Sequence, residues 1–192
     1  MPGGLKQLLG NPLFDDPSII HKQHPVSDLA GKTVQATGEG STPQFVLDYL
    51  LSLLNMTDQV KVEYVGEHTA LAALLASGES TLGMLPEPFV SSVMLKNANT
   101  RIAIDLNQEW EAATGAKLVQ GVYIVNREYY NKNADVIQQF LTDYQDSVNR
   151  VNTNVDASEL IAKLGIVASA DIAKVAIPRS NIVCITGEDM VN

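Results

Sequence analysis

The sequence predicts an α/β fold, with a parallel or mixed sheet flanked by helices and a helical segment at the C-terminal end. Two observations predict this class. Short apolar and β-branched runs alternate with longer helix-forming stretches over residues 32–106. The pattern then becomes mainly helical over residues 127–192. Apolar residues make up 45% of the chain of 192 residues, which is enough to bury a core.

The first strand and the first helix are joined by a glycine-bearing turn. Residues 32–36 read as a strand, and residues 37–40 form the turn. Ser41, Thr42 and Pro43 then predict a helix start, because Ser and Thr cap helices and Pro suits their first turn. The apolar pattern carries this helix through to Leu54.

The alternation of strands and helices continues to residue 106. β-Branched and apolar residues mark the strands. Alanine and leucine mark the helix at residues 69–76, and Gly78 is placed to end it. Right-handed crossovers between parallel strands would place the helices on the faces of the sheet. The predicted strands are residues 60–65, 81–85 and 101–106, and the predicted helices are residues 69–76 and 89–96.

The two ends of the chain have a different character. Residues 1–25 are rich in Gly and Pro, which predicts an irregular lead-in with at most a short apolar helix at residues 5–9. Near the other end, residues 121–125 predict a further strand, and a helical tail follows it. The tail is expected to contain helices at residues 135–150, 158–164 and 170–175, before a short apolar run at residues 181–185.

The charge balance argues against several classes of partner. The chain has 22 acidic and 13 basic residues, and its formal net charge is -9. Such a surface suits neither a nucleic-acid backbone nor an anionic membrane, and solubility is its simplest explanation. No apolar run reaches the roughly 18 residues that a membrane span needs. Cys184 is the only cysteine, so the sequence predicts no internal disulfide, no metal site and no cofactor.

The loop after the first strand is the first candidate ligand site, because ligands of open α/β sheets bind outside the carboxyl ends of the strands. Gly38 and Gly40 let the backbone approach a ligand, and the helix start offers N–H groups with a partial positive charge. Ser41 and Thr42 add hydroxyl donors just before Pro43. The loop would suit a carboxylate, sulfonate or phosphate, unless it is only an N-cap and a tight turn. It lacks the Gly-Lys-Ser/Thr ending of a nucleotide-binding P-loop.

The loop after the strand at residues 81–85 is the second candidate ligand site. Pro86 and Pro88 restrict its backbone and hold Glu87 and Phe89 in defined directions. A rigid carboxylate and an aromatic ring could recognise an amine or an aromatic ligand. Alternatively, Pro88 starts a helix and Phe89 packs in the core. We favour this alternative for Phe89, and less so for Glu87.

Other polar residues give weaker signals. His21 and His24 lie in the lead-in without a third metal ligand, and His68 stands before an alanine-rich helix, where a surface or capping role is commoner than catalysis. Trp110 follows a predicted strand end, so it either faces a cleft or packs against the core. No Gly-x-Ser-x-Gly motif and no distinctive pair of carboxylates marks catalysis. The sequence therefore predicts a protein that is not an enzyme and has no catalytic residue.

Several short motifs, taken in order, resemble one family. Residues 26–34 (VSDLAGKTV) are similar to the S-x-x-D-L-x-G-K-T/V stretch that opens the second lobe of type II periplasmic binding proteins. The set resembles a branch of the solute-binding lipoproteins of ABC importers, related to those for nitrate, sulfonates and thiamine precursors, from residue 26 to the C-terminus. The later motifs are residues 37–43 (TGEGSTP), 84–89 (MLPEPF), 105–110 (DLNQEW) and 185–190 (ITGEDM).

The resemblance implies a two-lobed extracytoplasmic protein, periplasmic or anchored as a lipoprotein. Such a protein closes around a small anionic or zwitterionic solute and then docks on an ABC permease in the membrane. Residues 26–126 would form its second lobe, and residues 127–192 would form a helical return segment that is incomplete at its C-terminal end. The ligand-binding residues would be Gly38, Gly40, Ser41, Thr42, Pro43, Pro86 and Glu87.

The chain departs from the family at its N-terminal end. Members begin with a lipoprotein signal and an N-terminal lobe, whereas residues 1–25 match neither and lack the pattern of a secretory signal. We therefore expect a truncated product whose exposed apolar surface favours a homodimer. Two other functions stay open. One is a remnant lobe that binds no ligand and serves as an oligomeric interaction module, and the other is a small α/β enzyme with Glu87 as its base.

Overall fold

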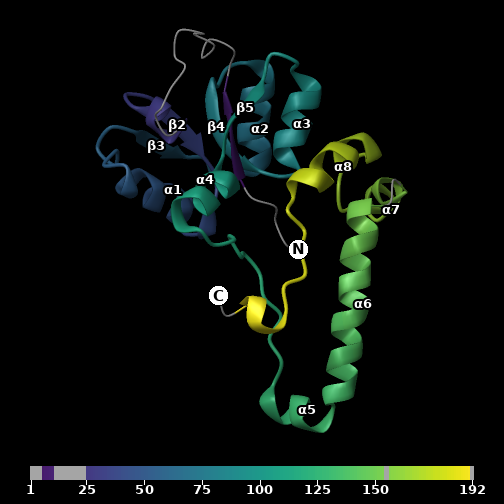
Figure 1. The fold of residues 1–192 in the computed structure, drawn as a ribbon. Coiled ribbons are helices and arrows are strands. Elements are labelled where there is room, and N and C mark those ends of the chain that lie inside the picture. Colours follow the sequence, from purple (N-terminus) through teal and green to yellow (C-terminus); the bar gives the residue numbers. More distant parts are fainter. Residues whose placement is uncertain (1–5, 11–24, 154–155, 191–192) are drawn as a thin grey trace. The chain divides into compact units, whose positions relative to one another are not determined.

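The chain divides into two units, Gly3–Leu118 and Val119–Asn192, and each is described by itself. The computed structural model describes residues 6–10, 25–153 and 156–190. Figure 1 shows that the first unit is a sheet flanked by helices, whereas the second consists of helices and irregular connections.

Over its described residues, the first unit is built on a five-stranded mixed sheet (Figure 1). In spatial order the strands are β3 (Lys61–Tyr64), β2 (Thr33–Ala36), β4 (Leu82–Pro86), β1 (Lys6–Gly10) and β5 (Arg101–Asp105). β2 pairs in parallel with β3 and β4, whereas β1 pairs antiparallel with β4 and β5. The predicted α/β class with a parallel or mixed sheet is thereby confirmed. β2, β3 and β5 lie within the predicted ranges, and β4 extends one residue beyond its range.

β1 overturns the prediction for the N-terminal end. The sequence predicts an irregular lead-in with at most a helix at residues 5–9, but Lys6–Gly10 is a strand between β4 and β5. Its five residues (KQLLG) include no β-branched side chain, so local propensity does not indicate a strand. Pairing with a neighbour on each side decides the conformation instead, and that pairing is invisible in the local sequence.

The helices predicted before residue 100 are confirmed. They are α1 (Thr42–Leu53), α2 (His68–Ser77) and α3 (Phe89–Lys96). Gly78 ends α2 with a φ of 84°, a left-handed conformation that glycine adopts at little cost. A 3-10 turn, η2 (Pro25–Leu29), precedes β2 and buries Val26 and Leu29.

One helix of this unit was missed. The sequence predicts a strand up to residue 106, but β5 ends at Asp105 and α4 (Leu106–Thr114) follows directly. The carboxylate of Asp105 accepts hydrogen bonds from the backbone N–H groups of Asn107 at 3.0 Å and Gln108 at 3.5 Å. This capping aspartate, together with a left-handed Gly115 at the far end, is the signal by which the helix could have been found.

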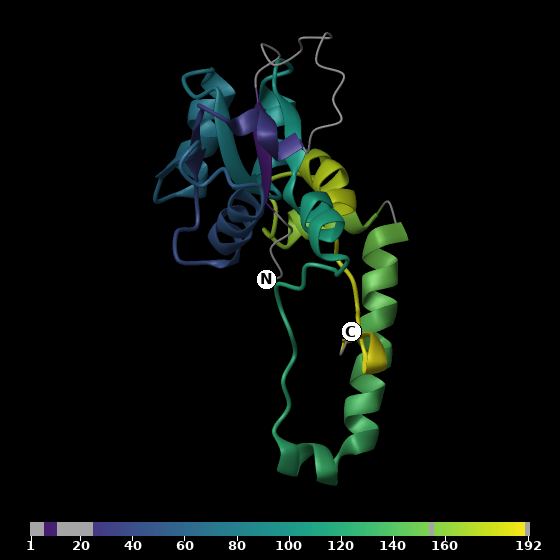
Figure 2. The same ribbon diagram turned by 60° about the vertical axis from the view of Figure 1, so that its left-hand side comes forward.

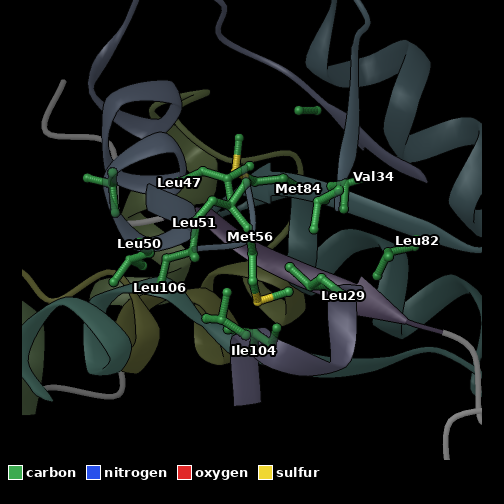
Figure 3. Close-up of a cluster of buried hydrophobic side chains, with 14 residues drawn as sticks. Leu29, Val34, Leu47, Leu50, Leu51, Met56, Leu82, Met84, Ile104 and Leu106 are labelled. Atoms are coloured by element: carbon green, nitrogen blue, oxygen red, sulfur yellow. The ribbon is translucent and has the colours of Figure 1, made fainter. Parts of the chain in front are cut away.

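The core occupies both faces of the sheet. Along β4, Leu82 and Met84 belong to one buried cluster, whereas Leu85 belongs to another, because successive side chains of a strand point to opposite faces. The larger cluster joins the sheet to α1 and α4 (Figure 3). The smaller one joins it to α2 and α3, where Leu71, Leu75, Val90 and Val93 pack beside Leu85.

Gly83 lets α2 approach β4 closely. A Cβ atom at this position would lie 2.6 Å from Cδ1 of Leu75 and 3.3 Å from its Cγ. Real carbon atoms do not approach that closely, so any side chain at residue 83 must displace a leucine that is itself buried. The glycine in an otherwise large and apolar strand is therefore a packing requirement.

The second unit is helical, and the helices predicted there are confirmed. The predicted strand at residues 121–125 is wrong, since this stretch pairs with no described strand and runs as irregular chain between α4 and α5 (Figures 1 and 2). A strand needs a neighbour for its backbone hydrogen bonds, and the described residues supply none. The helices are α5 (Arg127–Lys132), α6 (Ala134–Thr153), α7 (Ala157–Lys163) and α8 (Ala170–Ala176), followed by the 3-10 turns η3 (Ile177–Arg179) and η4 (Gly187–Met190).

We expect Gly83→Ala to lower the free energy of unfolding by about 1–3 kcal/mol, because the new methyl group overpacks the contact with Leu75. Urea unfolding followed by circular dichroism would measure the change. Gly66→Ala is the matched control, since a Cβ at Gly66 meets nothing within 4 Å, and its effect should stay within about 0.5 kcal/mol. Equal effects of the two substitutions would show that the contact between α2 and β4 is not tight.

Candidate ligand-binding site

The two loops expected to bind a ligand leave neighbouring strands. β2 and β4 are parallel and pair Ala36 with Met84, so the loops that follow them start at the same edge of the sheet. The buried Thr37 strengthens this link, because its hydroxyl donates a hydrogen bond to the carbonyl oxygen of Met84 at 3.4 Å. The carboxyl edge of the sheet thus brings residues 38–43 and 86–89 together, where open α/β sheets hold their ligands.

The first loop is a tight turn that leads into α1. Gly38 and Gly40 have φ values of 81° and 71°, in the left-handed region that favours glycine. The Ser41 hydroxyl donates to the Gly38 carbonyl oxygen at 2.6 Å and makes no capping bond to the helix. Thr42 and Pro43 form the first turn of α1. The backbone N–H groups at this helix start are therefore not capped by the Ser41 side chain.

Gln44 takes a place that the sequence did not indicate. Its side-chain oxygen accepts a hydrogen bond of 2.7 Å from the backbone N–H of Gly40, and its side-chain nitrogen donates to Asp48 at 3.3 Å. The amide therefore folds back over the loop, with Asp48 orienting it. An anion that bound to the Gly40 N–H group would have to displace the Gln44 oxygen.

Glu87 in the second loop is buried, with 4% of its surface exposed. Its carboxylate accepts a hydrogen bond from the backbone N–H of Ser91 in the first turns of α3, at 3.2 Å. A negative charge at the start of a helix is stabilised by the helix dipole. Pro86 is buried too, at the end of β4. Phe89 begins α3 and packs against the smaller core cluster, as the sequence analysis favoured.

His68 joins the two loops, and sequence reasoning underrated it. It is the first residue of α2, which follows β3, and its Nδ1 lies 2.8 Å from the hydroxyl of Thr37. Its ring also lies 5.2 Å from the ring of Phe89, centroid to centroid. Three adjacent strand ends therefore contribute side chains to one polar and aromatic contact. The strand order β3-β2-β4 brings them together, and no local motif reveals that order.

Acidic groups surround the start of α1. Tyr64 ends β3, and burial raises the pKa of its phenol above the ordinary value of 10.0, with further increases from the Asp48 and Glu39 carboxylates. Both carboxylates therefore contribute negative charge near the first loop, in which Glu39 itself lies. Their charge opposes a strongly negative ligand, although the N–H groups of the helix start attract one.

The remaining candidates do not join this site. Trp110 lies on α4 and packs against the larger core cluster, and its ring centroid lies 5.2 Å from that of Tyr49. These contacts confirm the packing role. His21 and His24 lie outside the described residues. Where the structure describes the chain, no group of three or more His, Cys, Asp or Glu side chains could hold a metal ion. Among the same residues, no helix has the length and apolar character needed to cross a membrane.

The raised pKa of Tyr64 predicts a loss of stability in alkali. The folded chain holds the phenol proton more tightly than the unfolded chain, so this stabilisation is complete below about pH 10 and decreases as the pH rises through the folded-state pKa. The free energy of unfolding, measured with urea, should therefore fall less between about pH 8 and pH 11 for Tyr64→Phe than for the unsubstituted chain. Tyr49→Phe serves as the comparison, and an equally reduced pH dependence in that variant would contradict the assignment to Tyr64.

Comparison with known proteins gives matches by structure and not by sequence. No family model matches the chain, and no curated protein matches it either. Solved structures do match. The aliphatic sulphonate binding protein SsuA of Escherichia coli has a TM-score of 0.69 at 18% identity, over 97% of this chain and 56% of that one. An ABC transporter protein from Parabacteroides distasonis has a TM-score of 0.64 at 17% identity, over 98% of this chain and 60% of that one.

A third match is the alkanesulfonate-binding protein SsuA of Xanthomonas axonopodis pv. citri, bound to MOPS, with a TM-score of 0.60 at 16% identity. It covers 93% of this chain and 56% of the other. The chain therefore spans somewhat more than half the length of the structures it matches. At these identities the likeness concerns the fold. The chain has the fold of the periplasmic solute-binding proteins of ABC importers.

Proposed function

We propose that this chain is part of the solute-binding component of an ABC importer and captures a small anionic or zwitterionic metabolite. One observation supports this most: the parallel pairing of β2 with β4 sets the glycine-bearing start of α1 beside the Glu87 loop. The fold supports it as well, since two of the similar structures are described as binding alkanesulfonates or aliphatic sulphonates. The ligand-binding residues in this proposal are Gly38, Gly40, Ser41, Thr42, Pro43, Pro86 and Glu87.

The chemistry of the site favours a ligand with a single negative group. A sulfonate or carboxylate can take the place of the Gln44 oxygen at the Gly40 N–H, next to the positive end of the α1 dipole. The nearby carboxylates of Glu39 and Asp48 make a multiply charged anion a poorer fit. A zwitterion suits this balance, because its positive end is compatible with the acidic side chains around the site.

Glu87 does not favour the enzymatic alternative. A general base must present its oxygen to a substrate proton, whereas Glu87 is buried and accepts a hydrogen bond from the N–H of Ser91. Its hydrogen bond to the start of α3 gives Glu87 a structural role, which is compatible with a binding site. The similar structures are binding proteins as well. Solute capture without catalysis therefore explains the arrangement better.

The wider setting follows from the same proposal. A solute-binding component works outside the cytoplasm, in the periplasm or as a lipoprotein, and delivers its ligand to a permease in the membrane. Residues 26–126 would belong to one lobe of a two-lobed protein whose closure is favoured by contacts of the ligand with both lobes. We propose two macromolecular partners, an ABC permease and a second copy of this chain.

A screen of small anions tests solute capture directly. Ethanesulfonate, 2-aminoethanesulfonate and MOPS should raise the Tm, because a ligand that binds only the folded state adds about 2.7 kcal/mol of stability at 100 times its Kd. Dimethyl sulfone is the uncharged control and should leave the Tm unchanged. Equal Tm values with all probes, extended to carboxylates and amino acids, would contradict the proposal.

Gln44→Ala should tighten the binding of any anion that the screen finds. The substitution removes the Gln44 oxygen with which the ligand competes for the Gly40 N–H. One hydrogen bond is worth about 1 kcal/mol, or roughly a fivefold lower Kd. Isothermal titration calorimetry would measure the change. Gln59→Ala is the matched control, since the Gln59 side chain donates to the backbone carbonyl oxygen of Asn55, just beyond the C-terminal end of α1 and away from the glycine-bearing loop at its start. Weaker binding by Gln44→Ala would instead make Gln44 a ligand contact.

A further inference from the structure

His68 lies at the carboxyl edge of the sheet but is not among the ligand-binding residues proposed so far. It begins α2, the helix that follows β3, and its Nδ1 atom lies 2.8 Å from the hydroxyl oxygen of Thr37, directly after β2. That hydroxyl donates to the carbonyl oxygen of Met84 on β4 at 3.4 Å. One histidine thus links the ends of three neighbouring strands, at the edge where open α/β sheets hold ligands.

The hydrogen bonds of Thr37 determine which nitrogen of His68 carries the hydrogen. A threonine hydroxyl has one hydrogen to donate, and the bond to Met84 uses it. Both bonds can therefore form together only if the hydroxyl oxygen accepts from an N–H group at Nδ1 of His68. In the neutral ring the other nitrogen, Nε2, is then a hydrogen-bond acceptor.

The surroundings of His68 restrict the orientation of its ring. Thr37 is fully buried, so the oxygen that meets Nδ1 is itself held in place. The ring of Phe89 lies 5.2 Å from the imidazole, centroid to centroid, and the two planes are tilted by 46°. His68 is half-buried, so part of this oriented ring is at the surface of the first unit.

The charge around the site favours a positively charged group beside His68. Burial raises the pKa of Tyr64 most, and the carboxylates of Asp48 and Glu39 raise it further, so negative charge acts at the end of β3. β3 is the strand that leads to His68. The face of an aromatic ring such as that of Phe89 also attracts cations. An ammonium group would therefore meet an acceptor, an aromatic ring and negative charge on one side of the site.

We propose that His68 is a specificity-determining residue of the solute site, and that its Nε2 atom accepts a hydrogen bond from the ammonium group of the ligand. The ligand is then a small aminosulfonate or amino acid, whose anionic end binds at the start of α1. This role of His68 rests on the proposed function and narrows its ligand class to amine-bearing zwitterions. A hydrogen bond from an ammonium group to a neutral imidazole is charge-assisted, and is stronger than a bond between two neutral groups.

The position of the hydrogen on His68 can be measured without any ligand. Long-range proton–nitrogen NMR spectra distinguish the two neutral forms of a histidine ring, and they should be recorded at about pH 8, where an imidazole is normally neutral. The signals that disappear in His68→Asn identify residue 68. We expect the form that carries its hydrogen on Nδ1. A ring that carries it on Nε2 would overturn the proposal, whatever the chain binds.

Isothermal titration calorimetry with matched pairs of ligands tests the contact itself. 2-Aminoethanesulfonate differs from ethanesulfonate only in its amino group, and should bind the unsubstituted chain about tenfold more tightly. His68→Asn keeps an amide N–H near the place of Nδ1 but has no atom at the place of Nε2, so it should remove most of this preference. His68→Gln is the matched control, because its amide reaches the place of Nε2 and its oxygen can accept, and it should retain part of the preference. 3-Aminopropanoate and propanoate repeat the comparison with carboxylates.

The ratio of the two Kd values separates recognition of the amine from a structural role, because a distorted site would weaken both members of a pair alike. Equal affinities in the unsubstituted chain, a preference that His68→Asn leaves unaltered, or an equal loss in His68→Asn and His68→Gln would each overturn the role of His68 while solute capture stands. If no member of either pair binds, and the wider screen finds no ligand, both proposals fail. The NMR measurement and the first comparison use the unsubstituted chain, so a variant that does not fold leaves the proposal testable.

Discussion

The parallel pairing of β2 with β4 is the contact on which the candidate site depends. It sets Ala36 opposite Met84, and the Thr37 hydroxyl continues the link one residue further to the Met84 carbonyl group. His68 adds β3 to the same arrangement through its bond to Thr37. Three chain segments that are far apart in sequence thus meet at one sheet edge. A change that altered the register of β2 against β4 by one residue would separate these side chains.

Much of the first unit could be predicted because its signals are local. Ser41, Pro43 and Gly78 mark helix boundaries through their own backbone preferences. α1 begins and α2 ends where these residues place those boundaries. α4 was missed although Asp105 and Gly115 carry the same kind of signal. β1 could not be predicted in this way, because its conformation is set by β4 and β5.

The candidate site shows the same division between local and long-range information. Both loops follow strand ends and could be located from the sequence, including the helix start behind Gly40. The contribution of His68 depends on the spatial order of three strands, which a single sequence does not contain. Gln44 was missed for a different reason: its role arises from a side-chain rotamer that returns over the turn. Long-range order and rotamer choice are therefore what the sequence leaves undetermined here.

The position of β1 has a consequence for how the sheet is assembled. β4 and β5 do not pair with each other, and β5 is joined to the rest of the sheet through the five residues of β1. Those residues come first in the chain, yet their partners lie more than seventy positions later, at Leu82–Pro86 and Arg101–Asp105. Contacts that span so much chain form slowly, because closing a long loop costs entropy before the contact compensates for it. The sheet is therefore complete only after β4 and β5 have paired with β1 across the intervening chain. Trimming the first ten residues would remove an inner strand of the sheet rather than a tail.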